Sequence, residues 1–238
     1  MDVIMIRLDK YLADMSIGTR TEVKKLIRQG KVSVDGMMVK NPDVKINSEK
    51  QTVTCDGQLV KYESFEYYML NKPAGVVSAT SDAKDKTVLD LIGDKKRKDL
   101  FPVGRLDKDT EGLLLITNDG ELAHRLLSPK KHVDKLYYAR VEGVVTDADK
   151  EAFIQGVDIG EEKLTKSAQL KIITSGEISE IELIIQEGKF HQVKRMFEAV
   201  GKKVIYLKRL SMGTLKLDDN LALGEYRPLT QEELEHLC

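Results

Sequence analysis

Three acidic and two basic side chains are crowded into a short polar stretch directly before an apolar run. They are Arg105, Asp107, Lys108, Asp109 and Glu111, and the run that follows is GLLLIT. A carboxylate in such a place can act as a nucleophile or as a general acid or base. Acids at alternate positions could also provide the carboxylate pair of a glycoside hydrolase. Because two cations lie among them, a pair that shares a proton is not required. An ordinary turn or strand-edge charge also stays open.

The rest of the chain offers little other catalytic machinery. The four histidines are scattered and lack the spacing of metal ligands: His124, His132, His191 and His236. The sequence contains neither a glycine-rich phosphate loop nor a G-x-S-x-G turn. Cys55 and Cys238 lie far apart, which suits a reducing compartment better than a disulfide framework. We therefore expect a cytoplasmic protein that uses no metal and no cofactor.

The N-terminal stretch predicts a compact unit of two helices and a hairpin. The spacing of Leu8 and Leu12 predicts a first helix, and Thr19-x-x-Glu22 is a capping-box pattern that opens a second. Alternating residues on both sides of an Asp-Gly pair at 35–36 predict two strands joined by a tight turn. The second helix carries four bases, and a fifth, Lys31, lies just past its end. Only one acid lies within the same twelve residues, so ion pairs along the helix itself cannot neutralise these charges.

Basic residues gather in segments although the net charge is only −1. Between Arg7 and Lys45, nine Lys or Arg stand against five Asp or Glu, and between Glu187 and Arg209 seven stand against two. The segment between Asp218 and Glu235 holds six acids and one base, and it offsets most of this positive charge in the net charge of the chain. A local basic surface attracts phosphate whatever the net charge, so a nucleic-acid partner fits the sequence.

Strands and helices continue to the C-terminus without a repeated strand–helix unit. Strands are predicted at YYMLN, GLLLITN, LYYARVEG, IELIIQ and KVIYL, and helices at ELAHRLLS, DADKEAFIQG, FHQVKRMFEAVG and TQEELEHL. This order favours an α+β fold with a mixed, mainly antiparallel sheet over a doubly wound one. We place an N-terminal domain and linker at residues 1–62 and a catalytic domain at residues 63–238. No apolar run approaches the roughly 20 residues that span a bilayer, so we expect no membrane contact.

The N-terminal segment RLDKYLADMSIGTRTEVKKLIRQGKVSVDG resembles the S4 domain, a small RNA-binding module. The resemblance implies that the basic face of the second helix rests on RNA phosphates. A rigid basic surface suits structured RNA, which proteins recognise mainly by shape and backbone. The residues expected to contact RNA are Arg7, Arg20, Lys24, Lys25, Arg28 and Lys31.

The polar stretch itself, GRLDKDTEGLLLITNDG, is similar to the signature loop of the pseudouridine synthases. The similarity is to the branch named after the small-subunit ribosomal RNA enzyme, the RsuA type. Three further blocks resemble other elements of that family: YYMLNKPAGVVS, KLYYARV and EGKFHQVKRMFEAVG. Together with the S4-like start, the resemblance spans nearly the whole chain and implies an isomerase that converts uridine to pseudouridine in ribosomal RNA.

The same resemblance assigns roles to four side chains. It implies that Asp107 is the covalent catalyst, Tyr137 the aromatic that stacks on the flipped base, and Lys194 the cation beside the carboxylate. Arg105 would fill the space that the flipped base leaves. Relatives often carry Arg where this chain has Lys194 followed by Arg195, so which of the two pairs with Asp107 stays open. Asp107 could attack the ribose C1′ or add to the uracil ring at C6. The reaction is redox-neutral and needs no cofactor.

Sequence outside these blocks bears on the substrate. Residues 128–137, 161–168 and 224–234 look like the small-subunit type, which implies uridine 516 of 16S RNA as the target. Five lysines there would add positive charge around the substrate path: Lys130, Lys131, Lys135, Lys163 and Lys166. Because that uridine lies in a folded stem, we expect a partly assembled ribonucleoprotein as substrate, and a monomeric enzyme. The alternatives are a synthase that acts on 23S RNA and, in a different class, a non-catalytic S4-type RNA-binding or assembly protein.

Overall fold

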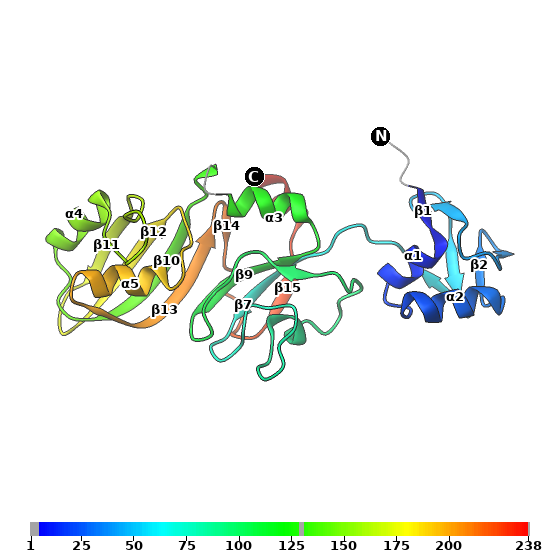
Figure 1. Ribbon diagram of the computed structural model, residues 1–238, viewed down its shortest axis with the longest axis horizontal. Coiled ribbons are helices and arrows are strands. Elements are labelled where there is room, and N and C mark those ends of the chain that lie inside the picture. Colours follow the sequence, from blue (N-terminus) through cyan, green and yellow to red (C-terminus); the bar gives the residue numbers. More distant parts are fainter. Residues whose placement is uncertain (1–4, 129–130, 238) are drawn as a thin grey trace. The chain divides into compact units, whose positions relative to one another are not determined.

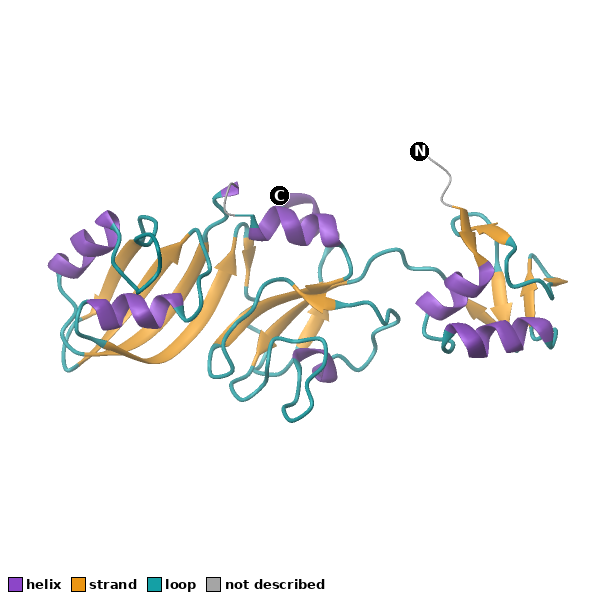
Figure 2. Ribbon diagram, in the orientation of Figure 1, coloured by secondary structure: helices purple, strands orange, loops and turns teal. Residues whose placement is uncertain are grey.

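The computed structural model describes residues 5–128 and 131–237. Lys130 and Cys238, which the sequence analysis names, lie outside these residues. Helices and strands are mixed along the chain, as Figure 2 shows, and the expected α+β fold class is confirmed. Among the described residues, none of the helices combines the length and the apolar character that crossing a bilayer requires.

The chain divides into two compact units. One consists of Met1–Glu66 together with Gly93–Leu100, and the other of Tyr67–Ile92 together with Phe101–Cys238. The boundary expected after residue 62 lies shortly before this division. The sequence gives no sign that Gly93–Leu100, which is flanked on both sides by the larger unit, packs within the N-terminal one.

The N-terminal unit contains the expected two helices followed by short strands (Figure 1). Strand β1 pairs with β4, and the other four strands form an antiparallel sheet in the order β3-β2-β5-β6. The apolar faces of both helices pack on these strands, and Leu8, Leu12 and Val23 are completely buried. The elements are β1 (Met5–Arg7), α1 (Leu8–Asp14), α2 (Arg20–Arg28), β2 (Val32–Val34), β3 (Met37–Met38), β4 (Lys45–Asn47), β5 (Val53–Cys55) and β6 (Gln58–Val60).

Local sequence signals set the ends of these elements as predicted. The Thr19 hydroxyl accepts a hydrogen bond from the Glu22 amide at 3.3 Å, and the Glu22 carboxylate accepts one from the Thr19 amide at 2.7 Å. This capping box starts α2. The predicted Asp-Gly turn at 35–36 and a second Asp-Gly pair at 56–57 both have positive φ angles, which the two-residue turns of the β2–β3 and β5–β6 hairpins require.

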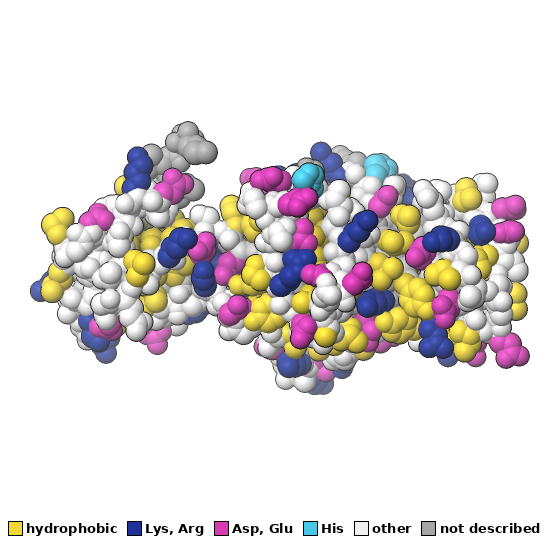
Figure 3. Space-filling model, turned by 180° about the vertical axis from the view of Figure 1, so that it is seen from behind, with side chains coloured by type: hydrophobic (Ala, Val, Ile, Leu, Met, Phe, Trp, Pro, Cys, Tyr) yellow, Lys and Arg dark blue, Asp and Glu magenta, His cyan; other side chains and the backbone are white. Residues whose placement is uncertain are grey.

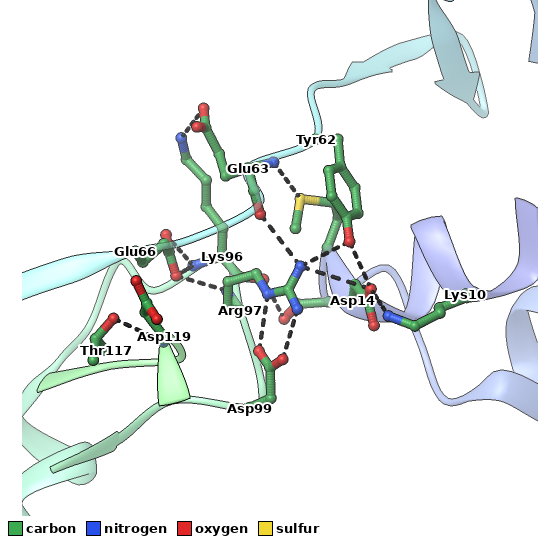
Figure 4. Close-up of polar contacts among 12 residues, drawn as sticks. Lys10, Asp14, Tyr62, Glu63, Glu66, Lys96, Arg97, Asp99, Thr117 and Asp119 are labelled. Atoms are coloured by element: carbon green, nitrogen blue, oxygen red, sulfur yellow. Dashed lines mark hydrogen bonds and ion pairs between the residues drawn. The ribbon is translucent and has the colours of Figure 1, made fainter. Parts of the chain in front are cut away.

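A buried arginine holds the Gly93–Leu100 segment within the N-terminal unit (Figure 4). Arg97 is only 4% exposed, and its guanidinium forms a two-pronged pair with Asp99 at 2.8 and 2.6 Å. It also donates to the Tyr62 hydroxyl and the Glu63 carbonyl, both at 3.2 Å, and lies 3.6 Å from Asp14. A buried charge is tolerated when its donors are used in this way, so the segment is fixed by specific polar contacts.

The larger unit is built on one sheet with strand order β11-β12-β10-β13-β9-β7-β15 among the described residues. Strand β14 pairs with β13 and β8 with β9, and every pairing is antiparallel except that of β13 with β9. The expected mixed, mainly antiparallel sheet is therefore confirmed. The strands are β7 (Tyr67–Lys72), β8 (Phe101–Pro102), β9 (Glu111–Thr117), β10 (Lys135–Glu142), β11 (Gln169–Thr174), β12 (Ile178–Ile185), β13 (Lys203–Met212), β14 (Leu215–Lys216) and β15 (Tyr226–Pro228).

The short contact between β9 and β13 joins the two halves of this sheet. Only two residue pairs form it, one of them Gly112 with Arg209. A Cβ atom on Gly112 would lie 2.2 Å from the Arg209 carbonyl oxygen, and the φ of Gly112 is +99°, so only glycine fits here. The apolar run that follows, Leu113 to Ile116, is fully buried. The polar stretch before β9 is thereby fixed at the junction of the two halves.

In the described part of the larger unit, four α-helices and one short 3₁₀ helix accompany the sheet. Helices α4 and α5 lie on the same face of the half-sheet formed by β11, β12, β10 and β13 (Figure 1). Phe153 of α4 and Phe197 of α5 meet edge to face, with ring centroids 5.0 Å apart. These elements are η1 (Val88–Leu91), α3 (Gly120–Leu127), α4 (Asp147–Gln155), α5 (Gln192–Ala199) and α6 (Gln231–His236).

Candidate active site

The loop before β9 is shaped by one buried ammonium group. Lys72, at the end of β7, is completely buried, and its Nζ donates to the carbonyl oxygens of Asp107 at 3.1 Å, Lys108 at 3.3 Å and Thr110 at 2.8 Å. A fourth carbonyl, of Pro73, lies at 3.0 Å. Several peptide carbonyls that point toward one centre repel each other, and a cation between them removes that repulsion. Lys72 thus fixes the backbone that carries Asp107.

Further contacts between the same two segments hold the rest of this loop. The Ser78 hydroxyl donates to the Leu106 carbonyl at 2.8 Å and accepts from the Leu106 amide at 3.1 Å. The Gly75 amide donates to the Lys108 carbonyl at 2.7 Å. The block YYMLNKPAGVVS therefore forms the support of the GRLDKDTEG loop.

The Asp107 carboxylate faces the first turn of α5. Its Oδ2 lies 3.1 Å from Lys194 Nζ, and its Oδ1 lies 3.6 Å from His191 Nε2. Both Asp107 and Lys194 are partly shielded, with side chains 24% and 19% exposed. Lys194 also contacts Asp109 at 2.6 Å, so one ammonium group bridges two carboxylates. The positive charge of Lys194 thus lies directly against the carboxylate of Asp107.

Ion pairing between the loop before β9 and helix α5 outweighs burial in setting the pKa values of Lys194 and Asp109. Burial by itself would lower the pKa of Lys194, but its hydrogen bonds to Asp109 and Asp107 outweigh burial and raise the pKa. Burial by itself would raise the pKa of Asp109, yet Lys194 lowers it. Lys194 therefore stays charged at neutral pH and keeps a positive charge against the carboxylate of Asp107.

Arg195, the second candidate partner, points elsewhere. Its guanidinium donates to the Glu161 carboxylate at 2.8 Å, to the Phe190 carbonyl at 3.0 Å and to the Ile159 carbonyl. Neighbouring positions on a helix face different directions, so only one of the two bases can reach the loop. The geometry selects Lys194 as the cation beside Asp107.

Tyr137 and Arg105 lie with Asp107 around one small pocket. The pocket has a volume of about 60 Å³ and is lined by all three residues, together with Thr110 and His191. Tyr137 of β10 is buried, whereas its neighbour Tyr138 meets Tyr206 at a ring-centroid distance of 6.0 Å; alternate strand residues point to opposite faces. All four residues assigned to catalysis by the sequence are thus brought together.

A hydrolase-type pair of carboxylates does not form here. Glu111 accepts a hydrogen bond from the Tyr206 hydroxyl at 2.7 Å, and Asp109 is 72% exposed and bound to Lys194. Neither shares a proton with Asp107 in this arrangement. Asp107 remains as the single shielded carboxylate of the pocket.

One of the lysines expected near a substrate path does not lie at the surface. Lys135 is buried and donates to the Val133 carbonyl at 2.8 Å. Lys131 and Lys163 are exposed.

In the N-terminal unit, the six residues expected to contact RNA fall into two groups. Arg7 pairs with Asp9 and Asp43, Lys24 lies 3.7 Å from Asp9, and Lys31 lies 3.3 Å from Asp56. Acids from other segments thus neutralise part of the basic surface, which the helix sequence by itself does not reveal. The second group lies exposed on α2, with no acidic partner within 4.0 Å among the described residues: Arg20, Lys25 and Arg28.

The sequence does not single out three side chains that matter here: Lys72, which is buried beneath the Asp107 loop, and His191 and Thr110, which line the pocket. Lys72 gave a detectable signal, a lone lysine at the end of an apolar strand. His191 was left outside the catalytic set, yet its ring faces Asp107. Thr110 is 1% exposed, lines the pocket, and its hydroxyl has no hydrogen-bond partner among the described residues. Nothing in the sequence distinguishes Thr110 from an ordinary loop residue.

Comparison with known proteins agrees with this fold. The family described as RNA pseudouridylate synthase matches residues 66–199, and the S4 domain matches residues 6–53. The chain therefore belongs to the RNA pseudouridylate synthase family, whose members convert uridine in RNA to pseudouridine, and it carries an S4 domain.

Relatives extend over almost the full length of the chain. An uncharacterized RNA pseudouridine synthase of Bacillus subtilis is 50% identical and covers 98% of each chain. The ribosomal small subunit pseudouridine synthase A of Escherichia coli (strain K12) is 42% identical over 96% of this chain and 98% of its own. A crystal structure of a pseudouridylate synthase matches 98% of this chain and all of its own at 39% identity, with a TM-score of 0.69.

Replacing Lys72 by Met removes the ammonium but keeps an unbranched apolar stem. We expect weaker stability, because each buried carbonyl left without a donor costs about 1–3 kcal/mol. We also expect kcat for uridine isomerisation to fall about a hundredfold, because the loop that carries Asp107 shifts. Lys84→Met, on an exposed lysine, is the matched control and should retain both properties. Unchanged kcat in Lys72→Met would show that the loop holds its shape without this group.

Comparison of the wild type with Lys72→Met also tests the pKa of Lys72. Burial lowers this pKa from its ordinary value of 10.5 to about 8, against the opposing effect of the Asp109, Asp107 and Glu111 carboxylates. Between these values the unfolded chain keeps a proton that the folded chain has lost, so a rise in pH favours folding. The free energy of unfolding of the wild type minus that of Lys72→Met should therefore grow from about pH 8 to about pH 10 in urea titrations. A constant difference would contradict the assignment.

Proposed function

We propose that this chain isomerises uridine 516 of 16S ribosomal RNA to pseudouridine through a covalent intermediate on Asp107. The observation that carries the proposal is the shielded Asp107 carboxylate, which contacts Lys194 in a pocket that Tyr137 also lines. A binding protein without activity would not need these three side chains together. Their convergence from a loop, a helix and a strand favours catalysis.

The reaction breaks the C1′–N1 bond, turns the uracil and forms a C1′–C5 bond, after which C5 releases its proton. Asp107 can attack C1′ and release uracil, which leaves the ribose bound to the carboxylate as an ester. C5 of the turned uracil then attacks C1′ and releases the carboxylate. Alternatively it can add to C6 of the ring and leave once the new bond has formed. Both routes return the carboxylate unchanged and transfer no net electrons, so the chain's own side chains suffice.

The other pocket residues have distinct tasks in this proposal. Lys194 holds the Asp107 carboxylate in place through their ion pair at 3.1 Å. Removing a base from an RNA stem costs roughly a few kcal/mol, and stacking on the Tyr137 ring recovers part of this cost. Arg105 is exposed at the rim of the pocket, where its guanidinium can enter the space that the extruded base leaves.

The choice of 16S RNA rests on relatives and on sequence outside the site. Proteins named ribosomal small subunit pseudouridine synthase A, from several bacteria, are 40 to 44% identical over nearly the full chain. The segments at residues 128–137, 161–168 and 224–234 also look like those of the small-subunit type. A partly assembled small-subunit particle as substrate, a monomeric enzyme and a cytoplasmic location belong to this proposal. A synthase that acts on 23S RNA is the competing function.

The role of Asp107 is tested by Asp107→Asn, which keeps the shape of the side chain and removes its negative charge. Tritium release from uridine labelled at C5 should fall by roughly three orders of magnitude or more. RNA affinity and the melting temperature should change little. Asp109→Asn is the matched control, because Asp109 is exposed and contacts the same lysine. Activity of Asp107→Asn within tenfold of the wild type would exclude Asp107 as the covalent catalyst.

The substrate is tested by deleting the gene in its host and mapping pseudouridine in both ribosomal RNAs by carbodiimide-dependent primer extension. We expect pseudouridine 516 of 16S RNA to disappear while all 23S sites remain. Restoring the wild-type gene, but not the Asp107→Asn gene, should restore the modification. Loss of a 23S site instead would assign the enzyme to the large subunit.

RNA docking by the S4 domain is tested by changing Arg20, Lys25 and Arg28 together to Gln. Fewer counterions are then released on binding, so the slope of log K against log salt should fall by about two to three. Turnover at saturating RNA should survive. A control with the same loss of charge carries Gln at three lysines of the larger unit, Lys150, Lys171 and Lys203. Equal weakening by both variants would argue against a specific docking surface on α2.

A further inference from the structure

The turn that precedes α5 presents an aromatic ring to solvent beside the catalytic pocket. Phe190 is 71% exposed, the second-highest exposure among the large hydrophobic residues of the described chain. Its ring stacks on His191 with a centroid distance of 3.8 Å and an interplanar angle of 19°. With one face against the imidazole and most of the ring exposed, the other face is open to solvent. An apolar ring kept in water at this position has no role in the core.

The turn is built to hold this pair of rings. His191 has a φ of +49°, a left-handed conformation that few residues other than glycine adopt. The backbone on both sides is anchored: Arg195 donates to the Phe190 carbonyl at 3.0 Å, and the buried Gln192 side chain accepts from the Lys189 amide at 2.9 Å. The aromatic pair is therefore a fixed surface and not the tip of an unsupported loop.

A second cavity lies next to this surface. Its volume is about 370 Å³, within the size range of small-molecule sites. Phe190 and His191 line it together with Val77, Ser78 and Lys108. This cavity shares several lining residues with the catalytic pocket, among them Arg105 and Asp107, so the two adjoin.

From this geometry we infer that Phe190 and His191 form a stacking platform for the base of a nucleotide that directly neighbours the target uridine. The inference rests on the proposed function, because it assumes that an RNA strand enters the catalytic pocket. A base needs a flat apolar surface, and the sugar-phosphate needs a cation. Lys108, whose ammonium also pairs with Asp85 at 2.7 Å, supplies one at the same cavity. His191 lies between Phe190 and Asp107, so a base on this platform also orders the ring that faces the catalytic carboxylate.

The test removes one stacking partner at a time. The substrate is the 16S segment that contains uridine 516, assembled with small-subunit proteins, with the nucleotide 5′ or 3′ of the target made abasic. For the wild type, one of these lesions should lower kcat/KM about 5- to 150-fold, the usual effect of losing a stacked base. For Phe190→Leu the same lesion should have less than about a twofold effect, whereas Phe190→Trp should behave like the wild type. Phe65→Leu, at another exposed phenylalanine, is the matched control.

Equal effects of the lesion on the wild type and Phe190→Leu would overturn the inference, as would a wild type that tolerates both lesions. A second measurement does not depend on which RNA is the substrate. Asp107→Asn protein is irradiated at 254 nm with total ribosomal RNA, and adducts are mapped by mass spectrometry. A nucleotide adduct on the peptide with Phe190 supports the platform, even if pseudouridine 516 proves not to depend on this enzyme. The absence of that adduct, with adducts present on S4-domain peptides, would overturn it.

Discussion

Four carbonyl oxygens converge on the Lys72 ammonium, and three of them belong to the loop that carries Asp107. A loop as rich in polar residues as this one would otherwise have many conformations of similar energy in water. The buried cation selects the one in which these carbonyls point inward, which leaves the Asp107 side chain directed toward α5. The position of the carboxylate is therefore set through its own backbone by a side chain more than thirty residues earlier in the chain.

The remaining parts of the site depend on the way the two halves of the sheet meet. Gly112 lets β9 approach β13 closely enough to pair, and this brings the loop of one half next to α5 and β10 of the other. Lys194 and Tyr137 then arrive from elements that have no local reason to be near Asp107. The site is consequently a product of one close backbone contact, and a side chain larger than hydrogen at that point would separate its parts.

Charge in this protein acts locally. The net charge is −1, and on the face drawn in Figure 3 Lys and Arg side chains are interspersed with Asp and Glu. Within this mixture Lys194 is held against two carboxylates, while α2 presents Arg20, Lys25 and Arg28 without acidic partners in the described part of the chain. Because exposed charges are screened within about 8–10 Å, these neighbourhoods, and not the total, decide which anions each surface can bind.

Much of the protein was determined by sequence alone. The capping box at Thr19, the Asp-Gly turn at 35–36 and the α+β class could be predicted, because each depends on a local pattern or on similarity to a known family. The same similarity named the residues that the structure brings together around Asp107. Tertiary structure decided what depends on distant contacts. It selected Lys194 over Arg195, buried Lys135, assigned acidic partners to Arg7 and Lys24, and placed residues 93–100 in the N-terminal unit. These outcomes required three-dimensional structure because a residue's spacing in sequence does not fix which distant group it meets.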